Sequence, residues 1–164
     1  MLLFDASYGA ADEPLVDQRS DLLAMAEAGP LLLPAPAGGR GLEMAVAFLE
    51  SDLPVAICAA HREVGERLLG QSAGWLTPGG QARIGRLLRE AAVLSPDSPA
   101  RGVMIGAGPN AERGVTEQLA PRFAAENTAR VIYTGHVAEG TPAAQQVAEG
   151  RAQFRRWNAV SYTH

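Results

Sequence analysis

The sequence predicts an α/β fold in which a doubly wound, mainly parallel sheet carries helices on both faces. Three observations predict it. Short apolar runs bounded by glycine or proline are typical of strands that are buried on both faces. Between these runs, apolar residues recur three and four positions apart, which is the spacing of helices packed on one side. The two patterns alternate along 164 residues, which favours parallel strands joined by crossover helices.

The expected strands, in chain order, are Leu2–Phe4, Pro30–Leu33, Pro54–Ala59, Gly102–Gly106, Arg130–Thr134 and Ala159–Tyr162. The expected helices are Leu15–Ala28, Gly41–Leu49, Arg62–Leu69, Gln81–Ala92, Ala111–Ala124 and Pro142–Ala148. Thr141 and Pro142 form a typical helix start, with threonine as the N-cap and proline at the first helical position. The stretch Leu94–Arg101 is short enough to be a surface connection. We therefore expect residues 1–164 to form a single domain.

The composition is that of a globular protein, with 47% hydrophobic and 20% charged residues. No apolar run approaches the roughly 18 residues of a membrane span. The N-terminal MLLFDASYG has no basic segment, so it does not resemble a signal peptide. A single cysteine excludes a disulfide framework and a cysteine-based zinc module. We therefore expect a cytoplasmic protein that makes no contact with a membrane.

All 14 basic residues are arginine, which we attribute to codon bias because alanine and glycine are also abundant. The net charge of −4 excludes a broad electrostatic surface for nucleic acid. Any phosphate must therefore bind at a local site, where arginine can form two parallel hydrogen bonds. Parallel sheets bind ligands outside the carboxyl ends of their strands. The loops that matter are then DASYG, PAPAGGRG, GAGPN and GHVAEGT, after Phe4, Leu33, Ile105 and Thr134.

Several single features allow both a structural and a functional interpretation. The loop Gly106–Asn110 has the outline of a dinucleotide site but lacks a later carboxylate, so a tight strand-to-helix turn is favoured over nucleotide binding. Cys58 lies in an apolar run with nothing to lower its pKa, which predicts a buried, inert thiol. His61 is expected at a helix start and His136 in a loop, both without metal-ligand spacing and either one simply solvated. Trp157 is expected to be partly buried, with base stacking as the alternative.

Four motifs follow one another along the chain: Leu3–Gly9 (LFDASYG), Gly39–Glu43 (GRGLE), Val131–Thr141 (VIYTGHVAEGT) and Ser161–His164 (SYTH). In this order they resemble the β-CASP domain of metallo-β-lactamase-fold nucleases, and the G-R-x-x-E segment is similar to the RNA-processing branch. The resemblance covers the whole chain and implies a Rossmann-like, three-layer domain. His136 departs from the tyrosine of the family, and Ala10-Ala11-Asp12 replace the polar residues that often follow Tyr-Gly.

The resemblance implies that Asp5 and His164 form an acid/histidine pair that protonates the leaving oxygen. It also implies substrate contacts for Ser7, Tyr8, Arg40, Gly135, His136, Gly140 and Thr141. An aspartate near one end of the chain and a histidine at the other can meet only if the fold brings both ends together. A domain inserted into a host requires this arrangement.

The chain has no H-x-H-x-D-H motif, so the resemblance implies that two zinc ions are held by a metallo-β-lactamase domain of the parent protein. We expect this chain to be a domain cut from that protein, with a natural stand-alone protein as the alternative. By itself it should bind no zinc and hydrolyse no RNA. The expected partners are the metallo-β-lactamase domain and RNA, with DNA and a homodimer left open. The alternative functions are a nucleotide-binding module and a catalytically silent β-CASP interaction domain.

Overall fold

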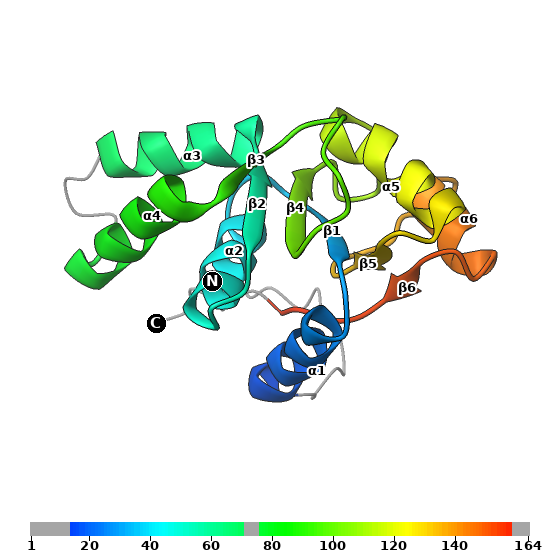
Figure 1. Ribbon diagram of the computed structural model, residues 1–164, viewed down its shortest axis with the longest axis horizontal. Helices are drawn as coiled ribbons and strands as arrows, with labels where there is room; N and C mark the ends of the chain where they lie inside the picture. The colour runs from blue at the N-terminus through cyan, green and yellow to red at the C-terminus, as the bar shows by residue number, and fades with distance from the viewer. Residues whose placement is uncertain (1–13, 71–75, 159–164) are drawn as a thin grey trace, which may run out of the picture.

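The computed structural model describes residues 14–70 and 76–158, which hold six strands and six helices (Figure 1). The strands are β1 (Leu31–Ala35), β2 (Val55–Cys58), β3 (Ala92–Leu94), β4 (Val103–Ala107), β5 (Arg130–Tyr133) and β6 (Gln153–Phe154). The helices are α1 (Leu15–Glu27), α2 (Arg40–Glu50), α3 (Ala59–Gly70), α4 (Pro78–Glu90), α5 (Gly114–Glu126) and α6 (Pro142–Ala148). The strands expected at Leu2–Phe4 and Ala159–Tyr162 lie outside the described residues.

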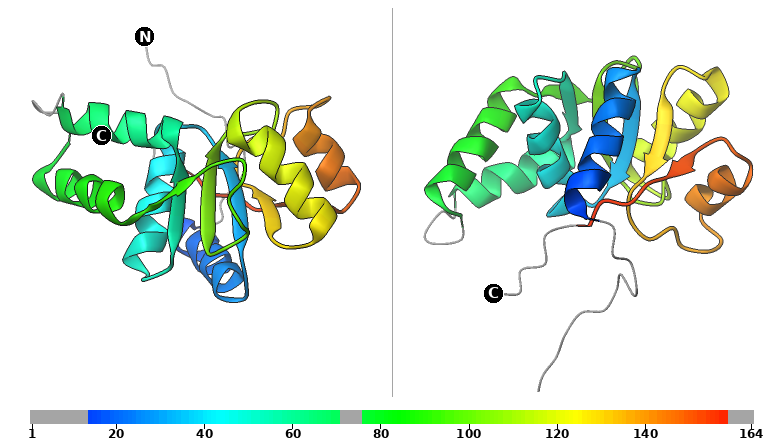
Figure 2. Two further views of the ribbon diagram at one scale, coloured as in Figure 1. Left: turned by 45° about the horizontal axis from the view of Figure 1, so that its top comes forward. Right: turned by 90° about the horizontal axis from the view of Figure 1, so that it is seen from below.

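The strands form one sheet in the order β3-β2-β4-β1-β5-β6, and every pairing within the described residues is parallel. The connection from β1 through α2 to β2 passes over β4, and the connection from β4 through α5 to β5 passes over β1. Helices α2 and α5 therefore contact the central strands β1 and β4 from opposite faces. Figure 2 shows α3 and α4 at one end of the sheet and α6 at the other. The predicted doubly wound α/β fold is confirmed.

The sheet has an apolar core on each face. Leu31 and Leu33 of β1 pack with α1, α2 and α4 on one face, while Leu32 packs with α5 and α6 on the other. All three leucines are fully buried. Because both faces are covered, the sequences of the central strands are continuous apolar runs and do not alternate between apolar and polar residues. None of the helices within the described residues is long and apolar enough to cross a membrane.

The structure differs from the sequence prediction at the two edges of the sheet. Strands β3 and β6 were not expected, because they are short and their side chains are largely exposed. Helix α3 begins directly after β2, with no intervening loop. The connection from β3 to β4 carries no helix and runs over the surface, as expected. Arg122 of α5 holds this connection by donating to the carbonyl oxygens of Pro96, at 2.8 Å, and Ser98.

Gly102 directs the chain into β4 and can only be a glycine. Its φ of +57° lies in the left-handed region. The N–H of Leu31 donates to the Gly102 carbonyl at 2.9 Å, and the N–H of Val103 donates to the Pro54 carbonyl at 2.8 Å. A Cβ atom at residue 102 would lie 2.3 Å from that Pro54 oxygen. The backbone on both sides is thus fixed by hydrogen bonds to β1 and to the residue before β2.

We expect Gly102→Ala to lower the free energy of unfolding by about 3 kcal/mol, since the left-handed backbone and the clash with Pro54 both oppose the methyl group. Gly150→Ala is the matched control, because residue 150 also has a positive φ, +69°, but a Cβ atom there meets nothing within 4 Å. The control should lose only about 1 kcal/mol. Equal losses in denaturant unfolding would contradict the role of the clash.

Candidate functional site

The carboxyl edge of the sheet contains a topological switch point between β1 and β4. These strands are neighbours, yet the chain leaves β1 towards α2 on one face and leaves β4 towards α5 on the other. Loops 36–39 and 108–113 therefore diverge from adjacent strand ends. In parallel α/β proteins, ligands bind where loops diverge in this way. The loop after β5, residues 134–141, lies beside them because β5 is the other neighbour of β1.

Arg40 and Gly135 bring two of the sequence motifs together at this edge. Arg40 is the first residue of α2 and follows Gly39, which has a φ of +57° at the N-cap. The guanidinium lies so close to Gly135 that a Cβ atom at residue 135 would be 1.9 Å from its Nη1. A side chain at residue 135 would therefore displace the Arg40 guanidinium from this place. The G-R-x-x-E and Thr-Gly-His motifs are in contact.

The other expected substrate residues after β5 are placed differently from one another. Thr141 is the N-cap of α6, as the sequence predicts: its hydroxyl donates to the Ala138 carbonyl at 2.6 Å and accepts the N–H of Ala144 at 3.3 Å. Its polar atom is therefore already used within the protein. His136 and Gly140 are exposed, and a Cβ atom at residue 140 would contact nothing within 4 Å. These two residues are accessible to a ligand.

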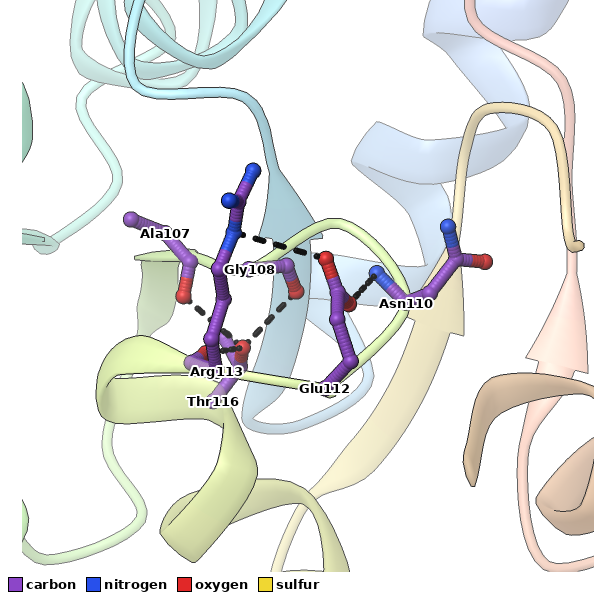
Figure 3. A network of polar contacts seen from close by, with 6 residues as sticks. All are labelled: Ala107, Gly108, Asn110, Glu112, Arg113 and Thr116. Atoms are coloured by element: carbon purple, nitrogen blue, oxygen red, sulfur yellow. Dashed lines mark hydrogen bonds and ion pairs between the residues drawn. The ribbon is translucent and has the colours of Figure 1, made fainter. Parts of the chain in front are cut away.

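Asn110 joins the loop after β4 to the loop after β5. Its side-chain oxygen accepts the N–H of Ala138 at 3.1 Å, and its backbone oxygen accepts the N–H of Ala143 at 3.1 Å. The carboxylate of Glu112 accepts the N–H of Asn110 at 2.7 Å (Figure 3). Asn110 therefore fixes the two loops relative to each other. The sequence gives little sign of this role, because the partners become neighbours only through the strand order.

The loop after β4 is longer than the tight turn that the sequence predicts. Residues 108–113 separate the end of β4 from the start of α5. Ala111, the last position of the G-x-G-x-x-A outline, thus lies in the loop rather than in the first helical turn. The Thr116 hydroxyl of α5 reaches back and lies 2.8 Å from the carbonyl oxygens of both Ala107 and Gly108 (Figure 3). The loop is therefore closed by its own helix.

Cys58 and His61 form a buried hydrogen-bonded pair at the same edge. The Sγ atom of Cys58 lies 3.2 Å from Nδ1 of His61, and the N–H of Ala107 donates to this sulfur at 3.3 Å. Nε2 of His61 lies 3.1 Å from the carbonyl oxygen of Pro36. His61 lies in the first turn of α3, as expected of a residue at a helix start, but it is fully buried and not solvated. The pair links the ends of β2 and β4 to the loop that leads to Arg40.

His61 also corrects the expectation that nothing lowers the pKa of Cys58. Burial raises the pKa of the thiol, but the hydrogen bonding and charge of His61 and the N–H of Ala107 outweigh burial and lower it to about 7. The burial of Cys58 is confirmed, since the residue is 5% exposed. A thiol so enclosed is suited to linking strand ends rather than to attacking a substrate. The Cys-x-x-His spacing at the end of the expected strand was the sequence signal that could have predicted this pair.

The two ends of the described chain also meet at this edge. The N–H of Asn158 donates to Oε1 of Gln18 in α1 at 2.7 Å. The N–H of Trp157 donates to the carbonyl oxygen of Thr134, at the end of β5, at 3.2 Å. The segments that join the domain at these adjacent points lie outside the described residues and carry four expected site residues: Asp5, Ser7, Tyr8 and His164.

Trp157 is buried more completely than the sequence predicts. It is 1% exposed, with its ring centroid 6.0 Å from that of Phe48 and the guanidinium carbon of Arg19 5.2 Å from its ring centroid. A ring covered in this way has no free face on which a base could stack. Trp157 is therefore a core residue at the carboxyl edge.

Comparison with known proteins leaves the family resemblance as a prediction. No model of a known protein family matches the chain. No curated protein matches it either. Across residues 14–70 and 76–158, no three histidine, cysteine, aspartate or glutamate side chains gather into a group that could hold a metal ion.

We expect the Cys58 thiol to titrate with a midpoint of about 7, and closer to the ordinary value of 9.0 in His61→Asn. The ultraviolet absorbance of the thiolate reports this titration, because Cys58 is the one cysteine in the sequence. Cys58→Ser gives the background signal. An unchanged midpoint in His61→Asn would show that the histidine is not the cause.

The same pKa difference predicts a pH-dependent stability. The folded-state pKa of Cys58 lies below its ordinary value of 9.0, so ionisation of the thiol stabilises the fold. This contribution should be complete above about pH 9 and should disappear as the pH falls through about 7. As the pH rises from about 7 to about 9, the wild-type protein should therefore become more resistant to urea than Cys58→Ser. A constant difference across this range would contradict the prediction.

Proposed function

We propose that this chain is the substrate-clamping β-CASP part of a zinc-dependent, metallo-β-lactamase-fold nuclease that hydrolyses RNA phosphodiester bonds. The observation that carries the proposal is the contact of Arg40 with Gly135 beside the switch point. A guanidinium held against backbone can offer two parallel hydrogen bonds to a phosphate. The start of α2, where this arginine lies, adds the positive end of a helix dipole. A local site of this kind is compatible with the net charge of −4.

The meeting of the two ends of the described residues supports the inserted-domain part of the proposal. Gln18 and Asn158 are hydrogen-bonded although 140 positions separate them in the sequence. A domain inserted into a host must leave and return at neighbouring points. Both points also lie at the edge of the sheet that carries Arg40. The segments with Asp5 and His164 therefore start close to the proposed phosphate site.

The family resemblance implies how the chemistry is divided between the two domains. Two zinc ions supply the activation of the attacking water in such enzymes, with ligands from the other domain. In the proposed mechanism, Arg40 holds a phosphate of the RNA strand in place. Asp5 orients the imidazole of His164, which donates a proton to the departing oxygen. The exposed His136 and Gly140 leave room for the strand beside the phosphate.

The loop after β4 gives less support to the alternative of a nucleotide-binding module. The Glu112 carboxylate already accepts the N–H of Asn110. A pyrophosphate that bound this N–H would have to displace the carboxylate, and the two negative groups would repel each other at close range. Calorimetry with NAD, FAD and nucleoside phosphates separates the two functions. Saturable micromolar binding would favour the nucleotide module over the nuclease.

We expect Arg40→Ala to weaken binding of single-stranded RNA to this chain by about tenfold, because one charge-assisted phosphate contact is lost. The slope of log affinity against log salt concentration is negative, and its magnitude should decrease by about 0.7, the value for one phosphate on a single strand. Fluorescence anisotropy of a labelled RNA at several salt concentrations measures both quantities. Arg67→Ala on α3 is the matched control, since its side chain is 71% exposed and lies away from this edge. Equal effects of the two substitutions would contradict a local site.

In the full-length protein, we expect Asp5→Asn and His164→Ala each to lower kcat for RNA hydrolysis by about 100-fold or more, with the RNA affinity unchanged. Steady-state kinetics and anisotropy measure the two effects separately. If neither substitution changes hydrolysis, the chain is the catalytically silent interaction domain instead. The parent reading frame should also encode an H-x-H-x-D-H motif upstream, and its absence would contradict the nuclease.

A further inference from the structure

Arg19 of α1 forms a compact group with Glu43 and Trp157, which we name the Arg19 cluster. Its Nη2 lies 2.7 Å from Oε1 of Glu43, and its guanidinium carbon lies 5.2 Å from the Trp157 ring centroid. The side chains of Arg19 and Glu43 are 38% and 24% exposed, against 63% and 42% for the Arg83–Glu50 pair at the other end of α2. The Arg19–Glu43 pair is therefore less screened by water, and the ring fixes its orientation.

The Arg19 cluster joins the two sides of the Arg40 contact. Glu43 lies one helical turn after Arg40, on the same side of α2. The backbone N–H of Trp157 donates to the carbonyl oxygen of Thr134. Thr134 directly precedes Gly135, the residue that the Arg40 guanidinium contacts. Arg19 therefore bridges the first turn of α2 and the end of β5. These are the two elements whose separation sets the position of the Arg40 guanidinium.

Helix α1 is itself firmly attached to the segment that carries Trp157. Besides Arg19, two of its residues contact residues 155–158. Gln18 accepts the N–H of Asn158 at 2.7 Å, and Asp21 pairs with Arg155 at 3.0 Å. Contacts from three residues within one turn of α1 hold this segment. The backbone that carries Arg19 is therefore held in place relative to Trp157.

We propose that Glu43 is a positioning residue for RNA binding, which acts by holding Arg19 and so fixes Arg40 against the end of β5. This inference rests on the proposed function, in which Arg40 contacts the phosphate. Within the G-R-x-x-E motif, the arginine then meets the RNA while the glutamate is used inside the protein. The carboxylate of Glu43 connects the first turn of α2, which carries Arg40, to α1.

The charge of Glu43 separates positioning from simple electrostatics by the sign of the effect. Removing a negative side chain near the RNA strengthens the attraction for phosphate. A purely electrostatic role therefore predicts tighter binding by Glu43→Ala. Positioning predicts the opposite, because Arg40 loses its fixed place and must be ordered again when RNA binds.

Anisotropy of a labelled single-stranded RNA provides the test. Glu43→Ala should weaken binding about five- to tenfold. Glu50→Ala removes the same charge and an interhelical ion pair from the same helix, and it should leave the affinity unchanged. In the Arg40→Ala background, Glu43→Ala should have no further effect, because the glutamate acts through the arginine.

Tighter or unchanged binding by Glu43→Ala overturns the inference. Equal losses with and without Arg40 also overturn it, since general destabilisation would give that result. If thermal unfolding shows that Glu43→Ala is not folded, Glu43→Asp replaces it, because this variant keeps the charge but is one methylene too short to hold Arg19. It should weaken binding to a similar degree. If Arg40→Ala weakens RNA binding but the substitutions of Glu43 do not, only this inference is wrong. If Arg40→Ala binds RNA as tightly as the wild-type protein, the proposed function is wrong as well.

Discussion

The opposite directions in which the chain leaves β1 and β4 govern the rest of this structure. The two strands are adjacent and parallel, but one continues to β2 and the other to β5. A right-handed crossover then places α2 on one face of the sheet and α5 on the other. The loops between these strands and helices must separate at the carboxyl edge. Polar residues such as Arg40 and Asn110 can gather there, while both faces of the sheet remain apolar.

The loops at this edge are held by contacts between elements as well as by contacts within each loop. His61 fixes the carbonyl of Pro36, Asn110 fixes the backbone of Ala138, and Arg19 fixes the first turn of α2. Each contact joins segments that are distant in the sequence. Ordering the loops during folding removes a cost that a ligand would otherwise meet on binding. The edge is therefore preorganised before any substrate arrives.

The apolar runs of the central strands and the helical spacing were sufficient to predict the fold class, because both report burial directly. Edge strand β3 escaped prediction since it has only three residues and Val93 is 64% exposed. At the site, the Thr141 cap could be predicted because its partners are local. The Cys58–His61 pair is also local, but its contacts with Ala107 and Pro36 depend on the strand order. The Arg19 cluster could not be predicted, since its partners come from segments that are distant in the sequence.

The absence of lysine, which we attribute to codon bias, has a structural consequence at this edge. Arg19 pairs with a carboxylate through one nitrogen while its plane covers an indole ring, and a lysine ammonium has no plane to do both. Arg40 lies against a glycine backbone so closely that no side chain fits between them. A guanidinium restricted in this way loses little further side-chain entropy on meeting a phosphate. In the proposed function, an acidic protein binds an anionic strand through the placement of a few arginines, without a basic surface.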